Sequence, residues 1–374
     1  MHKKLHILFL SGWYPSRVSP SNGDFVQRHA EAVATVQNVT LIHVITDKNI
    51  KRKECSTTLI NNVLTKIIYI PRTSNPISKF ISFFKTYLSE INKIGDFDLV
   101  HLNITYPVGI IALYLKIFKN KPFIISEHWS GYQKPKNKSI SFYQKIVTKR
   151  VVKNASFVCP VSKHLQKEME NFGLKGSYVP VPNVVDTSKF NISLNIPENF
   201  TITHVSGMNN EIKNIDGIIN IISKLQGKIP NLKFNLIGYN SNKYELKVKK
   251  LNIKNIHIID QISNIEVADY LKKTNVFIIF SNYENLPCVI LEAFASGVPV
   301  VSTNVGGISE YFPENFGYLT TPKDEIEFEK AILKIYNKKL NFDKKLMHNY
   351  AKKNFGIKTI ANSFSKKYYK ALNN

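Results

Sequence analysis

Short apolar runs, many of them rich in Val and Ile, alternate with longer amphipathic stretches along the first half of the chain. The runs predict buried strands, and the stretches at 25–36 and 80–94 predict helices between them. Repeated strand-then-helix order is typical of a parallel sheet with helices on both faces. The expected strands cover residues 6–10, 39–45, 99–103, 122–128 and 157–162.

The same pattern begins again after residue 200, with strands expected at 202–207, 233–239, 256–260, 276–281 and 298–303. Between the two series lies VPVPNVVDTSKF (179–190), which is rich in proline and turn residues. We therefore expect an α/β fold with two doubly wound parallel-sheet domains, residues 1–185 and 186–355. Such folds bind ligands at the carboxyl ends of their strands, so we expect a cleft there. The remaining residues, 356–374, predict an amphipathic helix, and the pattern leaves open which of the two domains it packs on.

The stretch SNYENLPCVILEAFASGVPVVSTNVGGISEYF (281–312) places two carboxylates around seven uncharged residues. Pro287 and the apolar run after it predict a buried helix, which Gly297 ends. Glu284 would lie at the helix N-terminus, where backbone N–H groups and the helix dipole favour a phosphate, and Glu292 further along the same helix. The two carboxylates would accept hydrogen bonds from hydroxyls on either side of a bound diphosphate. The spacing alone leaves open an accidental pair on a core helix.

The amino-acid composition indicates a cellular compartment and argues against some classes of site. Cys55, Cys159 and Cys288 are scattered without metal-ligand spacing, which fits a reducing cytoplasm and argues against a disulfide framework or a zinc site. No run approaches the ~20 apolar residues of a membrane-spanning helix. The beginning, MHKKLHILFLSGWYPS, predicts a first strand and not a signal peptide, because its apolar run is short and lacks a cleavage pattern.

The formal net charge is +24, and two thirds of this surplus lies in residues 1–190. Segments 79–88 (KFISFFKTYL) and 134–156 interleave Lys and Arg with Phe, Tyr and Ile, a pattern typical of helices on an anionic membrane. Ordinary amphipathic helices with their apolar faces in the core, and a codon bias toward Lys, Asn and Ile, are the alternatives. A nucleic-acid partner is not expected, because no recognisable binding motif accompanies the charge.

Several motifs in the same order resemble one enzyme family across essentially the whole chain. They are WYPSRVSPSNGDFVQRHAEAV, DLVHLNITYPVG, SEHWSGY, VPNVVDTSKF and the pattern from Glu284 to Gly307, which is similar to an E-x7-E signature. The family is the retaining, nucleotide-sugar-dependent glycosyltransferases of family 4. The resemblance implies the GT-B architecture, two Rossmann-like domains facing a cleft, with the donor bound by the second domain and the acceptor by the first.

The resemblance also implies roles for individual residues. Glu284 would contact the donor sugar and Glu292 the ribose hydroxyls, with Asn285 and Leu286 between them in the donor site. The backbone N–H groups of Cys288 and Val289 would face the diphosphate.

Three further positions complete the expected site. Lys213, in VSGMNNEIKNIDGII, would neutralise the leaving diphosphate, and Gly23 would let the first loop approach a phosphate closely. His128 would lie near the reacting carbon and the acceptor. The expected catalytic residues are His128, Lys213 and Glu284. A solvated surface lysine and a hydrogen-bonded core histidine are the alternatives for Lys213 and His128.

This chain departs from the family at three points. Met208 follows Gly207 where the family often has Arg, which makes Asn209 and Asn210 candidate neutral phosphate donors. Asn285 replaces a glycine and must tolerate the backbone angle that glycine would adopt. The first loop has Gly-Asp in place of Gly-Gly. None of these changes removes a residue that the expected reaction requires.

The resemblance implies a metal-independent reaction without a cofactor, in which helix N-termini and basic side chains stabilise the departing nucleoside diphosphate. No Asp-x-Asp occurs at a strand end, and no residue pattern marks a carboxylate nucleophile, so we expect a same-face substitution. The acceptor would be a glycan or lipid-linked glycan, and the enzyme cytoplasmic or peripheral at the inner face of the membrane. A catalytically silent nucleotide-sugar-binding protein is the alternative. A pyridoxal-phosphate-dependent phosphorylase is a weaker one, since no lysine stands out as an attachment site.

Overall fold

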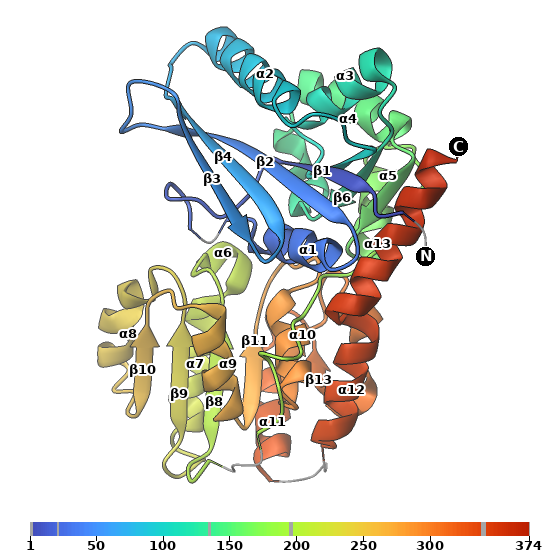
Figure 1. Ribbon diagram of the computed structural model, residues 1–374. Helices are drawn as coiled ribbons and strands as arrows, with labels where there is room; N and C mark the ends of the chain where they lie inside the picture. Colours follow the sequence, from blue (N-terminus) through green and yellow to red (C-terminus); the bar gives the residue numbers. More distant parts are fainter. Residues whose placement is uncertain (1–2, 21, 134–135, 194–196, 338–341, 374) are drawn as a thin grey trace. The chain divides into compact units, whose positions relative to one another are not determined.

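The computed structural model describes residues 3–20, 22–133, 136–193, 197–337 and 342–373. The chain forms two compact units (Figure 1). Unit 1 consists of residues 1–184 together with 357–374, and unit 2 of residues 185–356. Residues 134–135 of the expected basic segment, and 194–196 beyond the expected domain boundary, lie outside the described residues.

Within the described residues, the sheet of unit 1 has seven strands in the order β3-β4-β2-β1-β5-β6-β7. Neighbouring strands are parallel except β3, which runs antiparallel to β4 at one edge. The elements are β1 (His6–Ser11), α1 (Asp24–Ala34), β2 (Asn38–Asp47), β3 (Glu54–Ile60), β4 (Val63–Pro71), α2 (Pro76–Asn92), β5 (Leu99–Asn103), α3 (Gly109–Lys119), β6 (Phe123–Glu127), α4 (Phe142–Asn154), β7 (Phe157–Pro160), α5 (Lys163–Asn171) and α13 (Ile357–Leu372).

The direction of each crossover decides which face of this sheet a helix covers. The connections through α2, α3 and α4 all lead in one direction across the sheet, from β4 to β5, β6 and β7, whereas α1 leads the other way, from β1 to β2. Because parallel crossovers are right-handed, α2, α3 and α4 share one face and α1 lies on the other.

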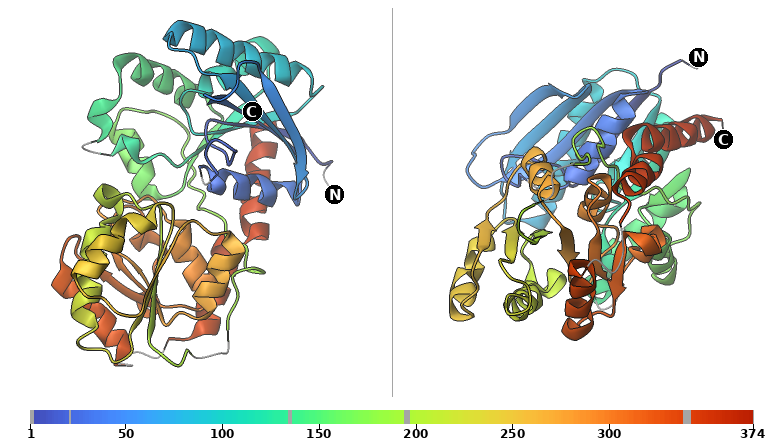
Figure 2. Two further views of the ribbon diagram at one scale, coloured as in Figure 1. Left: turned by 90° about the vertical axis from the view of Figure 1, so that its left-hand side faces the viewer. Right: turned by 90° about the horizontal axis from the view of Figure 1, so that it is seen from below.

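The C-terminal helix α13 belongs to unit 1, beside α1. Phe364 and Tyr368 of α13 are fully buried in the core that α1 contributes to. The Tyr368 hydroxyl also lies 2.6 Å from Nδ1 of His101 on β5. Tyr369 donates to the carbonyl of Lys3, so the two ends of the chain lie close together (Figure 1, Figure 2). The last helix is thus an integral part of the unit formed by the first half of the chain.

In the part of unit 2 that the structure describes, six parallel strands have the order β10-β9-β8-β11-β12-β13. Its core centres on α7, whose isoleucines are buried against β8, β9 and β11. The elements are β8 (Thr201–Val205), α6 (Asn210–Lys213), α7 (Ile215–Leu225), β9 (Lys233–Ile237), α8 (Glu245–Lys250), β10 (Ile256–Ile259), α9 (Asn264–Lys272), β11 (Val276–Ile279), α10 (Cys288–Ala295), β12 (Val300–Thr303), β13 (Gly317–Thr320), α11 (Glu325–Tyr336) and α12 (Lys344–Phe355).

All ten expected strands are present, but the sequence pattern did not predict β3, β4 and β13. The two predicted parallel sheets are present, and the antiparallel strand β3 is an addition at one edge of unit 1 that the pattern did not predict. β3 is exposed at nearly every position and carries polar residues, so it lacks the apolar run by which a buried strand is predicted. Across the described helices, none has both the length and the apolar character needed to cross a membrane.

Candidate functional site

The loop that follows β11 and the helix α10 into which it leads together carry six of the eight expected donor-binding residues. Pro287 is the N-cap residue and α10 begins at Cys288, one residue later than predicted. The backbone N–H groups of Cys288 and Val289 therefore belong to the first turn of α10, whose N-cap residue has no capping side-chain hydrogen bond. The predicted end of this helix is confirmed, because the C-cap Ser296 precedes Gly297, which has a left-handed backbone.

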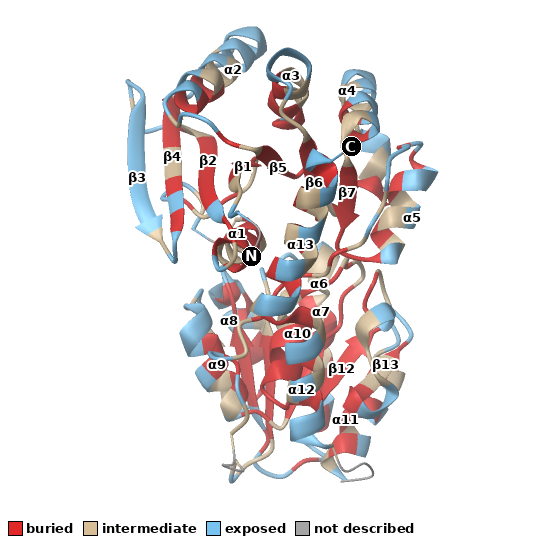
Figure 3. Cartoon of the chain, turned by 45° about the vertical axis from the view of Figure 1, so that its right-hand side comes forward, coloured by how far each residue is buried: buried red, intermediate tan, exposed pale blue. Residues whose placement is uncertain are grey.

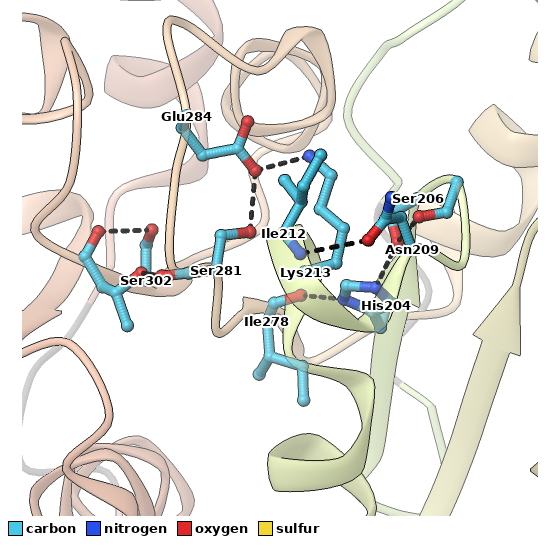
Figure 4. A network of polar contacts seen from close by, with 11 residues as sticks. His204, Ser206, Asn209, Ile212, Lys213, Ile278, Ser281, Glu284 and Ser302 are labelled. Carbon is cyan, nitrogen blue, oxygen red and sulfur yellow. Dashed lines mark hydrogen bonds and ion pairs between the residues drawn. The ribbon is translucent and has the colours of Figure 1, made fainter. Parts of the chain in front are cut away.

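The same loop is joined to the short helix α6, which brings Lys213 to Glu284. The backbone N–H of Asn282 donates to the carbonyl of Ile212 (2.8 Å), and its side-chain amide donates to the carbonyl of Glu211 (3.0 Å). As a result Nζ of Lys213 lies 2.5 Å from Oε1 of Glu284 (Figure 4). Lys213 is therefore ion-paired and not a solvated surface lysine.

The Lys213–Glu284 pair is largely shielded from solvent. The side chain of Lys213 is 19% exposed and that of Glu284 8%. The Ser281 hydroxyl donates to the same Glu284 oxygen at 2.7 Å, and the carbonyl of Ser281 accepts from Oγ1 of Thr303 at 2.6 Å. Charged groups at this depth need such partners, so the carboxylate is held in a defined position at the entrance to α10.

His204, on β8, lies below this pair (Figure 4). Its ring nitrogens bond to the carbonyl of Ile278 at 2.8 Å and the hydroxyl of Ser206 at 2.7 Å. Burial lowers the pKa of His204 to about 4; the Ile278 carbonyl opposes this shift and the positive charge of Lys213 adds to it. His204 is therefore neutral at pH 7 and adds no charge to the site.

The glycine pair after β12 fixes the backbone of the Glu284 loop. Gly306 has φ +62°, and a Cβ there would lie 2.0 Å from the carbonyl oxygen of Glu284. The N–H of Gly307 donates to the carbonyl of Asn285 at 2.7 Å. Only glycine fits at position 306, since any side chain would displace Glu284. Asn285 itself does not have a positive φ, so the expectation that it must adopt a glycine-like backbone is wrong.

The remaining donor-site candidates of unit 2 are two buried residues, Glu292 and Leu286, and two asparagines near Lys213. Glu292 is 1% exposed in the middle of α10, and Leu286 is 4% exposed at the base of the loop. The side chain of Asn210 donates one amide N–H to the carboxylate of Asp216 and accepts from the backbone N–H of the same residue. Asn209 accepts from the N–H of Ile212 and caps α6. These two asparagines shape the helix that carries Lys213.

Gly23 and His128 lie in unit 1, where the first loop packs on the end of β6. Gly23 has φ +76°, and a Cβ there would lie 2.5 Å from the backbone of Trp13. The loop therefore requires glycine for local reasons, whatever ligand it approaches. His128 is 9% exposed, and its ring stacks on Phe25 with centroids 4.3 Å apart and lies 5.2 Å from the ring of His29.

Glu127, immediately before the candidate residue His128, holds this segment in place and was not predicted from the sequence. It is fully buried, and its carboxylate accepts from the backbone N–H groups of Thr105, His128 and Trp129 at 2.9–3.0 Å. The hydroxyls of Thr105 (2.7 Å) and Tyr132 (3.2 Å) complete this set. A lone acidic residue at the end of an apolar strand was the available signal. Glu127 holds the segment that positions His128.

Buried neutral histidines make the stability of the protein depend on pH. Burial lowers the pKa of His29, His43 and His204 from 6.5 to about 4, and lowers that of His101 and His128 well below 6.5. Below pH 6.5 the unfolded chain binds protons that the folded chain does not. Each histidine therefore costs about 1.4 kcal/mol of stability per pH unit between 6.5 and its folded pKa.

We therefore expect the melting temperature (Tm) to fall steeply as the pH is lowered from 7.5 to 5. His43→Gln, which removes one of the shifted groups, is expected to reduce the difference between the melting temperatures at these two pH values. The exposed His257→Gln serves as control and should leave this difference unchanged. An equal difference for wild type and His43→Gln would contradict the assignment.

The described residues contain no group of three or more His, Cys, Asp or Glu side chains arranged to hold a metal ion. At the start of α10 and along it, unit 2 has the ammonium group of Lys213, the carboxylates of two glutamates and the backbone N–H groups of the first helical turn. A lysine and a helix N-terminus favour a phosphate group, and carboxylates favour hydroxyl groups. The arrangement is therefore suited to a ligand that carries both.

Two family models match consecutive parts of the chain. The model described as Glycosyltransferase Family 4 matches residues 30–189, and the model described as Glycosyl transferases group 1 matches residues 186–354. Among curated proteins, TuaC of Bacillus subtilis (strain 168), named as a glycosyltransferase of teichuronic acid biosynthesis, is 27% identical over 253 residues. That alignment covers 65% of this chain and 62% of TuaC, so the match spans less than two thirds of this relative.

Solved structures resemble the whole chain. Sucrose-phosphate synthase from Thermosynechococcus elongatus superimposes with a TM-score of 0.80 at 20% identity, covering 98% of this chain and 99% of that one. Anabaena Alr3699/HepE in complex with UDP and glucose has a TM-score of 0.76 at 15% identity, covering 98% and 100%. These similarities confirm the predicted fold class, the GT-B architecture with two Rossmann-like parallel-sheet domains.

Proposed function

The chain belongs to the glycosyltransferases that these two models describe, and on this premise we propose that it transfers a sugar from a nucleoside diphosphate sugar to a hydroxyl group of a glycan or lipid-linked glycan in surface polysaccharide assembly. The observation that carries this proposal is the Lys213–Glu284 pair at the entrance to α10. It combines a phosphate-binding cation, a helix N-terminus and a hydroxyl-binding carboxylate within one loop. The name of TuaC supports the choice of polysaccharide assembly.

In the proposed reaction the diphosphate lies against the N-terminus of α10 and Lys213. Lys213 exchanges its contact with Glu284 for the diphosphate, which frees the carboxylate to accept a hydrogen bond from a sugar hydroxyl. Glu292, further along α10, accepts from the ribose hydroxyls. Negative charge grows on the leaving diphosphate, and the lysine and the helix N–H groups stabilise it without needing a metal ion.

We propose that the configuration at the anomeric carbon is retained. The acceptor hydroxyl attacks the face that the diphosphate leaves, and a phosphate oxygen takes up its proton. His128 lies near the acceptor in this scheme, in neutral form because burial lowers its pKa well below 6.5. The reaction takes place in the cytoplasm, where nucleoside diphosphate sugars serve as donors.

Donor binding can be tested by thermal unfolding with UDP, GDP, ADP and their common sugar conjugates. A ligand that binds only the folded chain at 100 times its Kd stabilises it by about 2.7 kcal/mol, a rise of several degrees in Tm. One base should raise the Tm of wild type but not that of Glu292→Ala. Glu329→Ala, which removes another buried glutamate of unit 2, is the matched control and should keep the ligand-induced rise.

Two outcomes would contradict the proposal. If no nucleotide raised the Tm of wild type at millimolar concentration, the assignment of a donor site to unit 2 would be wrong. If a nucleotide sugar bound but released no nucleoside diphosphate with any acceptor extract or with water, the protein would be a silent nucleotide-sugar-binding protein.

A further inference from the structure

Three helices of unit 1 carry an unusual share of the exposed apolar residues. Of the 18 large hydrophobic residues that are exposed in the described chain, eight lie on α2, α3 and α4. Their exposed fractions range from 37% for Ile146 to 80% for Phe142. The α2–α4 face is defined by these eight residues: Ile77, Phe80, Ile81, Ile117, Phe118, Phe142, Tyr143 and Ile146. Single exposed apolar residues are ordinary, but a concentration of them marks a contact surface.

The sheet topology places these residues on one side of unit 1. The three helices cover the same face of the sheet, and they lie next to one another in the order α2, α3, α4 (Figure 3). Ring contacts connect α2 to α3, with centroids 6.1 Å apart for Phe80–Phe84, 5.7 Å for Phe84–Tyr114 and 4.9 Å for Tyr114–Phe118. Exposed and half-buried rings thus form a row across two helices.

The charge of the same helices is almost entirely positive. α2 carries Lys79 and Lys85, α3 carries two lysines, and α4 carries three lysines and one arginine. The single acidic residue among the three helices is Glu90, which is 2% exposed and paired with lysines. The outer surface therefore offers cations interleaved with aromatic and aliphatic side chains and has no exposed carboxylate of its own.

We propose that the α2–α4 face is a docking surface that holds the enzyme on an anionic lipid bilayer. Phe, Tyr and Ile side chains would insert at the level of the headgroups, and the lysines would contact lipid phosphates. A second copy of the chain does not fit this surface, because it would bring two strongly basic faces together. Docking would bring unit 1 to a lipid-linked acceptor, and this consequence rests on the proposed function.

The docking surface can be tested by sedimentation with vesicles at low and physiological salt. One set contains phosphatidylcholine alone, and the other contains phosphatidylcholine with 30% phosphatidylglycerol. Wild type should bind the anionic vesicles, less so at higher salt, and should bind the neutral ones weakly. The double variant Phe118→Ser/Phe142→Ser should lower the bound fraction about tenfold, because it removes two large residues from the insertion surface.

A matched control separates docking from general hydrophobicity. Leu246→Ser/Ile326→Ser removes two residues of unit 2 that are 80% and 63% exposed, and it should leave vesicle binding unchanged. Because all four residues are exposed, both double variants should fold with wild-type melting temperatures. Equal binding to neutral and anionic vesicles, no binding to either, or equal losses in the two variants would overturn the proposal.

Two further measurements complete the test. A dimer in solution that Phe118→Ser/Phe142→Ser dissociates would also overturn the proposal, because the face would then be an interface between copies. Vesicle binding does not depend on the donor site. If the protein binds anionic vesicles but no nucleotide shifts its Tm, the docking surface is supported and the proposed function is contradicted. If a nucleotide shifts the Tm but the protein does not bind anionic vesicles, only the docking surface is contradicted.

Discussion

Replacing Lys213 by alanine is expected to lower kcat for release of the nucleoside diphosphate by about 10²–10³-fold. The lysine is held beside Glu284, and the loop that holds it is fixed by two hydrogen bonds from Asn282 to α6. In the proposed reaction this cation exchanges Glu284 for the diphosphate when the donor binds, and it then stabilises the leaving group without further rearrangement in the transition state. Lys213→Arg keeps the charge but differs in shape, so an intermediate rate is expected. Initial rates with the nucleotide sugar identified by thermal unfolding measure both.

A control is needed because Lys213→Ala also leaves Glu284 without its ion pair. Lys224→Ala removes a lysine of the same unit from its pair with Glu325, where the side chains are 49% and 29% exposed. Such exposed pairs contribute about 0–1 kcal/mol, so this variant should retain both its Tm and its rate. If Lys213→Ala kept more than a tenth of the wild-type kcat, Lys213 would be a structural partner of Glu284 and not a catalytic residue.

The strands that position the site were predictable because they are buried on both faces. β11, which leads into the Glu284 loop, is buried at all four positions and lies within the run 276–281 that predicted it. β3 was not predictable, since it is exposed at six of its seven positions. Its existence depends on pairing with β4 at the edge of the sheet, a tertiary contact that leaves no apolar pattern in the sequence.

The site was only partly predictable for a related reason. The helix start near Pro287 and its end at Gly297 follow from local backbone preferences. The contact between Lys213 and Glu284 joins residues 71 positions apart, and it depends on backbone hydrogen bonds between α6 and the loop after β11. The resemblance to a family placed Lys213 in the site, but spacing alone did not. The catalytic and donor-binding roles of these residues stay predictions.

Glu127 is a second residue whose importance depends on contacts between distant segments. Glu127→Ala is expected to destabilise unit 1 by about 3–5 kcal/mol, a fall in Tm on the order of 10 °C. The carboxylate is fully buried and accepts five hydrogen bonds, three of them from backbone N–H groups. Removing it leaves those donors buried without an acceptor, and unpaired buried polar groups cost more than the bonds themselves contribute. Thermal and chemical unfolding measure the loss.

Glu90→Ala provides the comparison, because Glu90 is also nearly buried in unit 1, but the partners of its carboxylate among the described residues are the lysines Lys53, Lys66 and Lys93. Two of these lysines, Lys53 and Lys93, are 43% and 57% exposed, so water can hydrate them once the carboxylate is gone. We therefore expect Glu90→Ala to cost clearly less than Glu127→Ala. Equal costs would mean that burial of the carboxylate, and not its backbone donors, sets the penalty. A larger cost for Glu127 would identify it as the residue that fixes the backbone around His128, the residue proposed to lie near the acceptor.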